Sequence, residues 1–224
     1  LNTMIKHLIF DCDGVIVDSE ILASEITVSM LQPFGYALSA MEHARRFAGM
    51  KEHDIFAHIR QDGIEIPDNF IEKVAAAFVD QFAKKLKPIK GMPKLIQQVQ
   101  LPNSVVSNSH KKSVISSTTR AKVRDYFGER IFSAEMVAFP KPAPDLYRLA
   151  IERIGIDPKE LLVVEDSPTG VQAAVGAGLK TIGFLGAGHI SEGHGDLLRE
   201  RGALDLARDA DHLSQMLMAL GVEF

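Results

Sequence analysis

The chain has 224 residues, of which 46% are hydrophobic and 24% charged, and its formal net charge is −4. This balance excludes an intrinsically disordered chain, which would have few apolar residues and a large net charge. It also lacks the basic excess that binding to a phosphate backbone requires, so we expect no nucleic-acid partner. No apolar run is long enough to cross a membrane, and the single cysteine, Cys12, cannot form an internal disulfide. We therefore expect a soluble, cytoplasmic protein of one or two domains with no membrane partner.

Short apolar runs recur along the chain and predict the buried strands of a mostly parallel sheet. These runs are residues 6–10, 104–106, 161–164 and 181–185. Helical patterns lie between the later runs, at 111–127, 145–154 and 171–177. This alternation of strands and helices predicts an α/β core with a doubly wound, Rossmann-like parallel sheet.

Residues 19–87 show helical periodicity only, with no strand pattern among them. Within this segment Phe70, Val74, Phe78 and Phe82 follow one another at four-residue steps, which predicts the inner face of a helical bundle. A helical segment of this length between the first and second strands predicts an inserted cap domain. The expected domains are a core of residues 1–18 and 88–224 and a helical cap of residues 19–87.

Polar side chains follow three of the predicted strands, at the point where each strand ends. They are Asp11 and Asp13, then Ser107, Asn108 and Ser109, and finally Glu165 and Asp166. Ligands of open α/β sheets bind in the crevice beyond the carboxyl ends of the strands, so these groups are expected to meet there. Four carboxylates in one crevice repel one another unless a cation neutralises them. Hard oxygen ligands favour Mg²⁺, and Lys141 is expected to add a basic group.

Each of these features, taken alone, has a simpler explanation. A lone Asp-x-Asp is more often a turn, and a lone Lys141 is more often a surface lysine. Cys12 would need a histidine base to act as a nucleophile, and nothing in the sequence places one beside it. The histidines of GAGHISEGHG, His189 and His194, match no zinc spacing, and the glycines around them favour a mobile loop. The order of polar residues at successive strand ends is what favours a catalytic site.

Four segments resemble, in order, the four motifs of the haloacid dehalogenase superfamily of phosphohydrolases. They are FDCDGVIVDSE, VVSNS, KPAPDLY and VVEDSPTGVQAA. The wording DGVIVDS and the helical insert resemble in particular the β-phosphoglucomutase-like branch, which includes sugar-phosphate phosphatases. The resemblance covers nearly the whole chain.

The resemblance implies a role for each matching residue of the first motif. Asp11 would be the nucleophile that attacks phosphorus and becomes an aspartyl phosphate. Asp13 would protonate the leaving alkoxide and then activate water. Mg²⁺ would be held by Asp11, by the backbone carbonyl of Asp13 and by Asp166, with Glu165 as a further ligand or a neighbour of the ligands.

The later motifs would bind the substrate. Lys141 and Ser107 would contact the oxygens of the transferred phosphoryl group. Asn108, Ser109 and His110 would complete the phosphate and substrate contacts.

These roles together imply a Mg²⁺-dependent phosphatase that acts on a small-molecule phosphate ester, most simply a sugar or polyol phosphate. Two alternatives stay open: a phosphomutase of the same branch, and a non-catalytic protein that senses phosphate. In the cap loop FAGMKEHD we expect Gly49 and Lys51 to contact substrate, while Ala48 and Glu52 depart from the mutase pattern. The sequence does not specify an oligomeric state.

Overall fold

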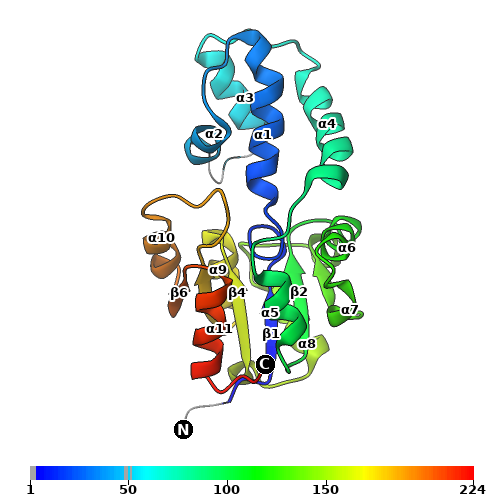
Figure 1. Cartoon of the computed structure of the whole chain (residues 1–224), viewed down its shortest axis with the longest axis vertical. Helices are drawn as coiled ribbons and strands as arrows, with labels where there is room; N and C mark the ends of the chain where they lie inside the picture. The colour runs from blue at the N-terminus through cyan, green and yellow to red at the C-terminus, as the bar shows by residue number, and fades with distance from the viewer. Residues whose placement is uncertain (1–3, 48–49, 51) are drawn as a thin grey trace. The chain divides into compact units, whose positions relative to one another are not determined.

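The computed structural model of the protein describes residues 4–47, 50 and 52–224. The chain divides into two compact units, Ser19–Leu86 and the remainder, in which Lys87–Phe224 joins the segment that ends at Asp18 (Figure 1). Among the described residues, no helix has the length and apolarity that a membrane crossing requires.

The unit that contains Lys87–Phe224 is called the first unit, and Ser19–Leu86 the second. The first unit is built on a six-stranded sheet in which every neighbouring pair of strands is parallel. The strands lie in the order β3-β2-β1-β4-β5-β6. Their bounds are β1 His7–Phe10, β2 Asn103–Ser107, β3 Ile131–Ser133, β4 Leu161–Glu165, β5 Lys180–Phe184 and β6 Asp205–Ala207. This order confirms the predicted doubly wound α/β core. β3 and β6, each of which has three residues, are not among the strands predicted from the sequence.

Helices cover both faces of this sheet (Figure 1). They are α5 Met92–Gln98, α6 Lys111–Arg120, α7 Arg124–Phe127, α8 Asp145–Ile154, α9 Pro168–Gly176, α10 His194–Glu200 and α11 Ala210–Ala219. α5 packs against α11, and α8 packs against α9 over a buried cluster that includes Ile9, Val106 and Tyr147. The single helical pattern predicted for 111–127 is two helices, because Lys122 adopts a left-handed backbone conformation (φ 59°) that ends α6.

The second unit is entirely helical within the described residues. It contains α1 Ser19–Leu31, α2 Ala40–Arg46, α3 Glu52–Gln61 and α4 Phe70–Lys85. Phe70 and Val74 of the predicted apolar stripe are buried in the core of this unit. Phe78 and Phe82 stack 4.8 Å apart and are only half-buried, and Phe78 lines a cavity of about 550 Å³ within the unit. Phe70 and Val74 thus lie in the core of the unit, and Val74 and Phe78 line the cavity.

The return of the chain to the first unit occurs one residue earlier than expected. The carbonyl of Lys87 accepts the N–H of Asp18 at 2.9 Å, and Val17 forms an antiparallel bridge with Pro88. Lys87 therefore lies with the first unit because its backbone pairs with the segment that follows β1.

Candidate active site

The turn that follows β1 presents the first two acidic residues at the carboxyl end of the sheet. It is closed by two backbone hydrogen bonds to the Cys12 carbonyl and by a 2.8 Å bond from the N–H of Gly14 to the carbonyl of Val17. Gly14 has φ +82°, and a Cβ atom there would lie 1.9 Å from Asp166 Oδ2. Only glycine fits this position, because both the backbone conformation and the close carboxylate exclude a side chain.

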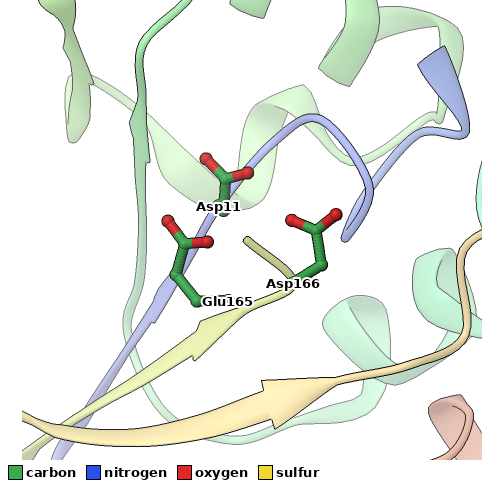
Figure 2. Close-up of side chains that lie close together, drawn as sticks. All are labelled: Asp11, Glu165 and Asp166. Carbon is green, nitrogen blue, oxygen red and sulfur yellow. The ribbon is translucent and has the colours of Figure 1, made fainter. Parts of the chain in front are cut away.

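Three carboxylates converge at this end of the sheet: Asp11 after β1, and Glu165 and Asp166 at the end of β4 (Figure 2). One ligand oxygen from each lies within 4.8 Å of the others, and all three residues are buried. β1 and β4 are neighbours in register, with Phe10 opposite Val164, so the residues that follow these strands meet. This convergence is the feature that the spacing of acids along the sequence predicts.

Lys141 places a buried ammonium group between two of these carboxylates. Its Nζ donates to Asp11 Oδ1 at 2.8 Å, to Glu165 Oε1 at 2.5 Å and to the Val106 carbonyl at 2.7 Å. The side chain of Asn108 fixes the backbone of Lys141, accepting its N–H at 3.0 Å and donating to its carbonyl at 2.9 Å. Lys141 is thus an internal cation and not a surface lysine.

Glu165 is held at both carboxylate oxygens. Besides Lys141, Oε1 accepts the hydroxyl of Tyr147 at 3.1 Å, while Oε2 accepts the backbone N–H and the hydroxyl of Ser167 at 3.2 and 3.1 Å. A Cβ atom at Gly170 would lie 1.8 Å from Oε1, so α9 also packs directly on this carboxylate. Sequence reasoning missed Tyr147, whose signal was only its place six residues after Lys141 on an apolar helical face.

The electrostatics of the cluster favour a bound cation. Burial and the nearby charge of Glu165 together raise the pKa of Asp11 to about 8, although Lys141 acts in the opposite direction. Burial would lower the pKa of Lys141, but Asp11 and Glu165 raise it well above its ordinary value. One ammonium faces three carboxylates, which leaves two negative charges in a buried space when all are ionised. A divalent cation with oxygen ligands fits this donor set.

The carboxylate of Asp13 faces a different set of groups. Its Oδ2 accepts the hydroxyl of Ser109 at 2.7 Å and that of Ser107 at 3.4 Å. The N–H of Ser109 in turn donates to the Ser107 hydroxyl at 3.0 Å. Among the described residues, three of the four expected carboxylates, those of Asp11, Glu165 and Asp166, therefore form one group. The fourth, that of Asp13, lies beside the serine hydroxyls. This separation places Asp13 and the end of β2 on the side of the site opposite Glu165.

The other predicted site residues are not part of this arrangement. His110 is exposed, and its Nδ1 lies 2.6 Å from Glu135 Oε2. Gly49 and Lys51 lie outside the described residues. Cys12 is fully buried, and burial raises the pKa of its thiol well above the ordinary value, which disfavours a nucleophilic thiolate.

His189 and His194, which match no zinc spacing in the glycine-rich sequence, lie against Asp166 in the structure. His189 Nε2 lies 3.4 Å from Asp166 Oδ2, and His194 Nε2 lies 2.6 Å from the Asp166 carbonyl oxygen. Their ring centroids are 6.2 Å apart. Glycine content suggested mobility, whereas the two histidine side chains bring the loop against a residue of the cluster.

The family model for haloacid dehalogenase-like hydrolases matches residues 8–184, a span that contains every element of this site. The chain belongs to this family. It is 30% identical over 187 residues to the 6-phosphogluconate phosphatase of Escherichia coli, covering 83% of this chain and 85% of that protein.

Solved structures of haloacid dehalogenase-like proteins extend the comparison to the whole fold. A family hydrolase from Deinococcus radiodurans, solved with bound phosphate and sodium, is 27% identical with a TM-score of 0.89 and coverages of 98% and 97%. A candidate β-phosphoglucomutase from Thermotoga maritima is 26% identical with a TM-score of 0.78 and coverages of 95% and 98%. The family and these relatives confirm the predicted branch and identify a phosphoric monoester hydrolase.

Proposed function

We propose that the protein is a Mg²⁺-dependent phosphatase that hydrolyses a small sugar or polyol phosphate through an aspartyl phosphate on Asp11. The observation that carries this proposal is the buried cluster in which Lys141 bridges Asp11 and Glu165 beside Asp166. A carboxylate held against a fixed cation is oriented before substrate arrives, and such preorganisation is the main way in which proteins stabilise phosphoryl transfer.

The first step transfers the phosphoryl group to the protein. A carboxylate oxygen of Asp11 forms a bond to phosphorus as the ester P–O bond breaks, and the leaving alkoxide takes a proton from Asp13. Asp13 is suited to this role because its carboxylate lies beside the hydroxyls of Ser107 and Ser109 and outside the group formed by the other three acids.

The second step returns the phosphoryl group to water. Asp13, now ionised, accepts a proton from a water molecule. The oxygen of that water attacks phosphorus, and the bond between phosphorus and Asp11 breaks. The products are inorganic phosphate and the original Asp11 carboxylate. Lys141 and the Ser107 hydroxyl are the groups of this chain that stabilise charge on the phosphoryl oxygens in both steps.

Asp11, Asp166 and the backbone carbonyl of Asp13 would hold Mg²⁺, with Glu165 beside them. When bound, the ion supplies positive charge that offsets the carboxylates and the phosphoryl oxygens. The donor set consists of oxygens only, which suits Mg²⁺ better than metals that prefer nitrogen or sulfur.

The class of substrate is proposed from the relatives. One of them is named for 6-phosphogluconate, and another is a candidate β-phosphoglucomutase, so both names refer to phosphorylated sugars or sugar acids. A general acid at Asp13 is needed for an alkoxide leaving group, which agrees with a phosphate ester of an alcohol.

The test measures inorganic phosphate and isomerised sugar phosphate together across hexose, pentose and sugar-acid phosphates, with Mg²⁺ or with excess chelator. We expect metal-dependent phosphate release without a bisphosphate activator. When the reaction with ³²P-labelled substrate is quenched with acid, we expect the protein to carry label that hydroxylamine removes. The Asp11→Asn variant should carry no label. Isomer formed faster than phosphate, and only with bisphosphate present, would establish the mutase instead. Absence of both products across the panel would favour a non-catalytic phosphate sensor.

A further inference from the structure

Two histidines from one stretch of chain contact the same acidic residue of the cluster. His189 lies in the loop after β5, and His194 is the first residue of α10. The first faces the carboxylate of Asp166 and the second faces its main-chain carbonyl, at 3.4 and 2.6 Å. Only 15% of the His189 side chain is exposed, so its imidazole is enclosed beside the carboxylate.

The contact from His194 has a defined direction. A carbonyl oxygen can only accept a hydrogen bond, so His194 Nε2 must carry the hydrogen and donate it. The acceptor lies at the junction between β4 and α9, because Ser167, the next residue, caps α9 by accepting the N–H of Gly170. His194 therefore holds the backbone at the point from which the Asp166 side chain projects.

The carboxylate of Asp166 is confined from two sides. On one side lies the backbone of Gly14, where a Cβ atom would stand 1.9 Å from Oδ2. On the other lies the His189 ring, 3.4 Å from the same oxygen. Because Gly14 and His189 both lie close to this oxygen, few rotamers are available to Asp166, and the position of its carboxylate depends on both residues.

The loop that carries His189 is itself fastened to the core. Both carboxylate oxygens of Asp18 accept the N–H of Gly188 at 3.1 Å. The residue before His189 is thus tied to the segment that follows β1, and His194 ties the other end of the loop to β4. Gly14 and Asp18 both belong to the segment that follows β1. This segment therefore contacts the Asp166 carboxylate directly through Gly14 and holds the His189 loop through Asp18.

We propose that His189 and His194 are a positioning pair that fixes Asp166, one at its carboxylate and one at its carbonyl, and thereby sets the affinity of the acidic cluster for a divalent cation. This inference rests on the proposed function, because it requires the cluster to bind a cation. Neither histidine acts on phosphorus. Groups that orient a metal-binding carboxylate typically change metal affinity by about 10–100-fold when removed.

The experiment is a calorimetric titration of the purified, metal-free protein with Mg²⁺ at one fixed pH and without substrate. His189→Ala and His194→Ala are each expected to raise the Kd for Mg²⁺ at least about tenfold. His194→Gln keeps an N–H donor and is expected to stay within about threefold of wild type. Ser191→Ala, which changes the same loop between the two histidines, serves as the matched control and should leave the Kd unchanged. If His189→Ala fails to fold, His189→Asn makes the same comparison with an amide too short to reach Asp166.

A second readout separates positioning from a merely structural role. At saturating Mg²⁺ the KM of the alanine variants for substrate should match wild type. At limiting Mg²⁺ their rate should fall by the same factor by which their Kd for Mg²⁺ rises. Equal Mg²⁺ affinity in wild type and in both alanine variants would overturn the inference while leaving the proposed function intact. Failure of the wild-type protein itself to bind Mg²⁺ would instead overturn the metal-dependent function, and the inference with it.

Discussion

Gly170→Ala is a substitution for which local helix propensity and tertiary packing predict opposite results. Gly170 lies in the first turn of α9, and its φ is not positive, so its backbone conformation suits any residue. Alanine in a helix is ordinarily more stable than glycine by about 0.5–1 kcal/mol. From the helix alone, the variant should therefore be more stable than wild type.

The packing around Glu165 reverses that expectation. A Cβ atom at position 170 would lie 1.8 Å from Glu165 Oε1 and 2.0 Å from its carboxyl carbon. Glu165 has no exposed surface and is held by Lys141, Tyr147 and Ser167, so the carboxylate cannot move without losing hydrogen bonds. A charge-assisted hydrogen bond contributes about 1.5–3 kcal/mol and a neutral one about 0.5–1.5 kcal/mol. Loss of the Lys141 and Tyr147 bonds, less the helix gain, destabilises the variant by about 1–4 kcal/mol.

The measurement is urea unfolding of wild type, Gly170→Ala and Gly176→Ala, with phosphate release assayed in parallel. Gly176 ends the same helix, and a Cβ atom there would meet the side chain of Pro144 at ordinary distances of 3.6 and 3.9 Å. The control variant should therefore be as stable as wild type or slightly more so, with full activity. A Gly170→Ala protein as stable and active as the control would show that the Glu165 carboxylate is not rigidly held.

Three further predictions address the nucleophile, the metal and the sheet. Asp11→Asn should abolish phosphate release while melting at or above the wild-type temperature, since it removes one charge from a buried cluster; residual turnover near wild type contradicts covalent catalysis. Chelation should stop phosphate release and Mg²⁺ restore it, whereas Ca²⁺ should restore little because its longer, more variable coordination misplaces ligands. Burial, aided by Arg130, lowers the pKa of His7 to about 4 from 6.5, so the unfolded chain binds a proton that the fold excludes. The free energy of unfolding should fall as pH drops from 6.5 towards 4, by up to about 3 kcal/mol from this group. In the His7→Gln variant, the unfolding free energy from urea titrations should change less steeply with pH.

Local patterns were sufficient to predict where the acidic residues of the first and fourth motifs lie. An apolar run that stops at acidic residues indicates both a strand and its carboxyl end, so Asp11, Glu165 and Asp166 could be assigned to one crevice before any coordinates. The same reasoning placed Asp13 in this crevice, and the structure adds that its carboxylate accepts the hydroxyls of Ser107 and Ser109. Spacing along a chain specifies which edge of the sheet a residue reaches, and it does not specify which neighbours a side chain will contact there.

Contacts that depend on tertiary structure could not be read from the sequence in this way. Tyr147 lies on an otherwise apolar helical face, and nothing local indicates that its hydroxyl reaches Glu165. His189 and His194 lie among glycines, and glycine-rich sequence is compatible with either a mobile loop or a fastened one. The difference lies in the bonds from Asp18 and Asp166, which are separated from the loop by 170 and 28 residues. Long-range pairs of this kind leave no periodic signal.

The order of the strands explains why these residues, and not other polar residues, form the site. β1 lies between β2 and β4, so Asp11 emerges between the end of β2, which carries Ser107, and the end of β4, which carries Glu165. At β1 the chain first adds strands on one side and then on the other, and this reversal opens a crevice between the connections that leave in opposite directions. The Asp11 carboxylate, directly after β1, therefore has the end of β2 with the Ser107 hydroxyl on one side and the carboxylates at the end of β4 on the other. Any strand order that moved β4 away from β1 would leave the same four motifs in the sequence but would separate Asp11 from the acids with which it could share a cation.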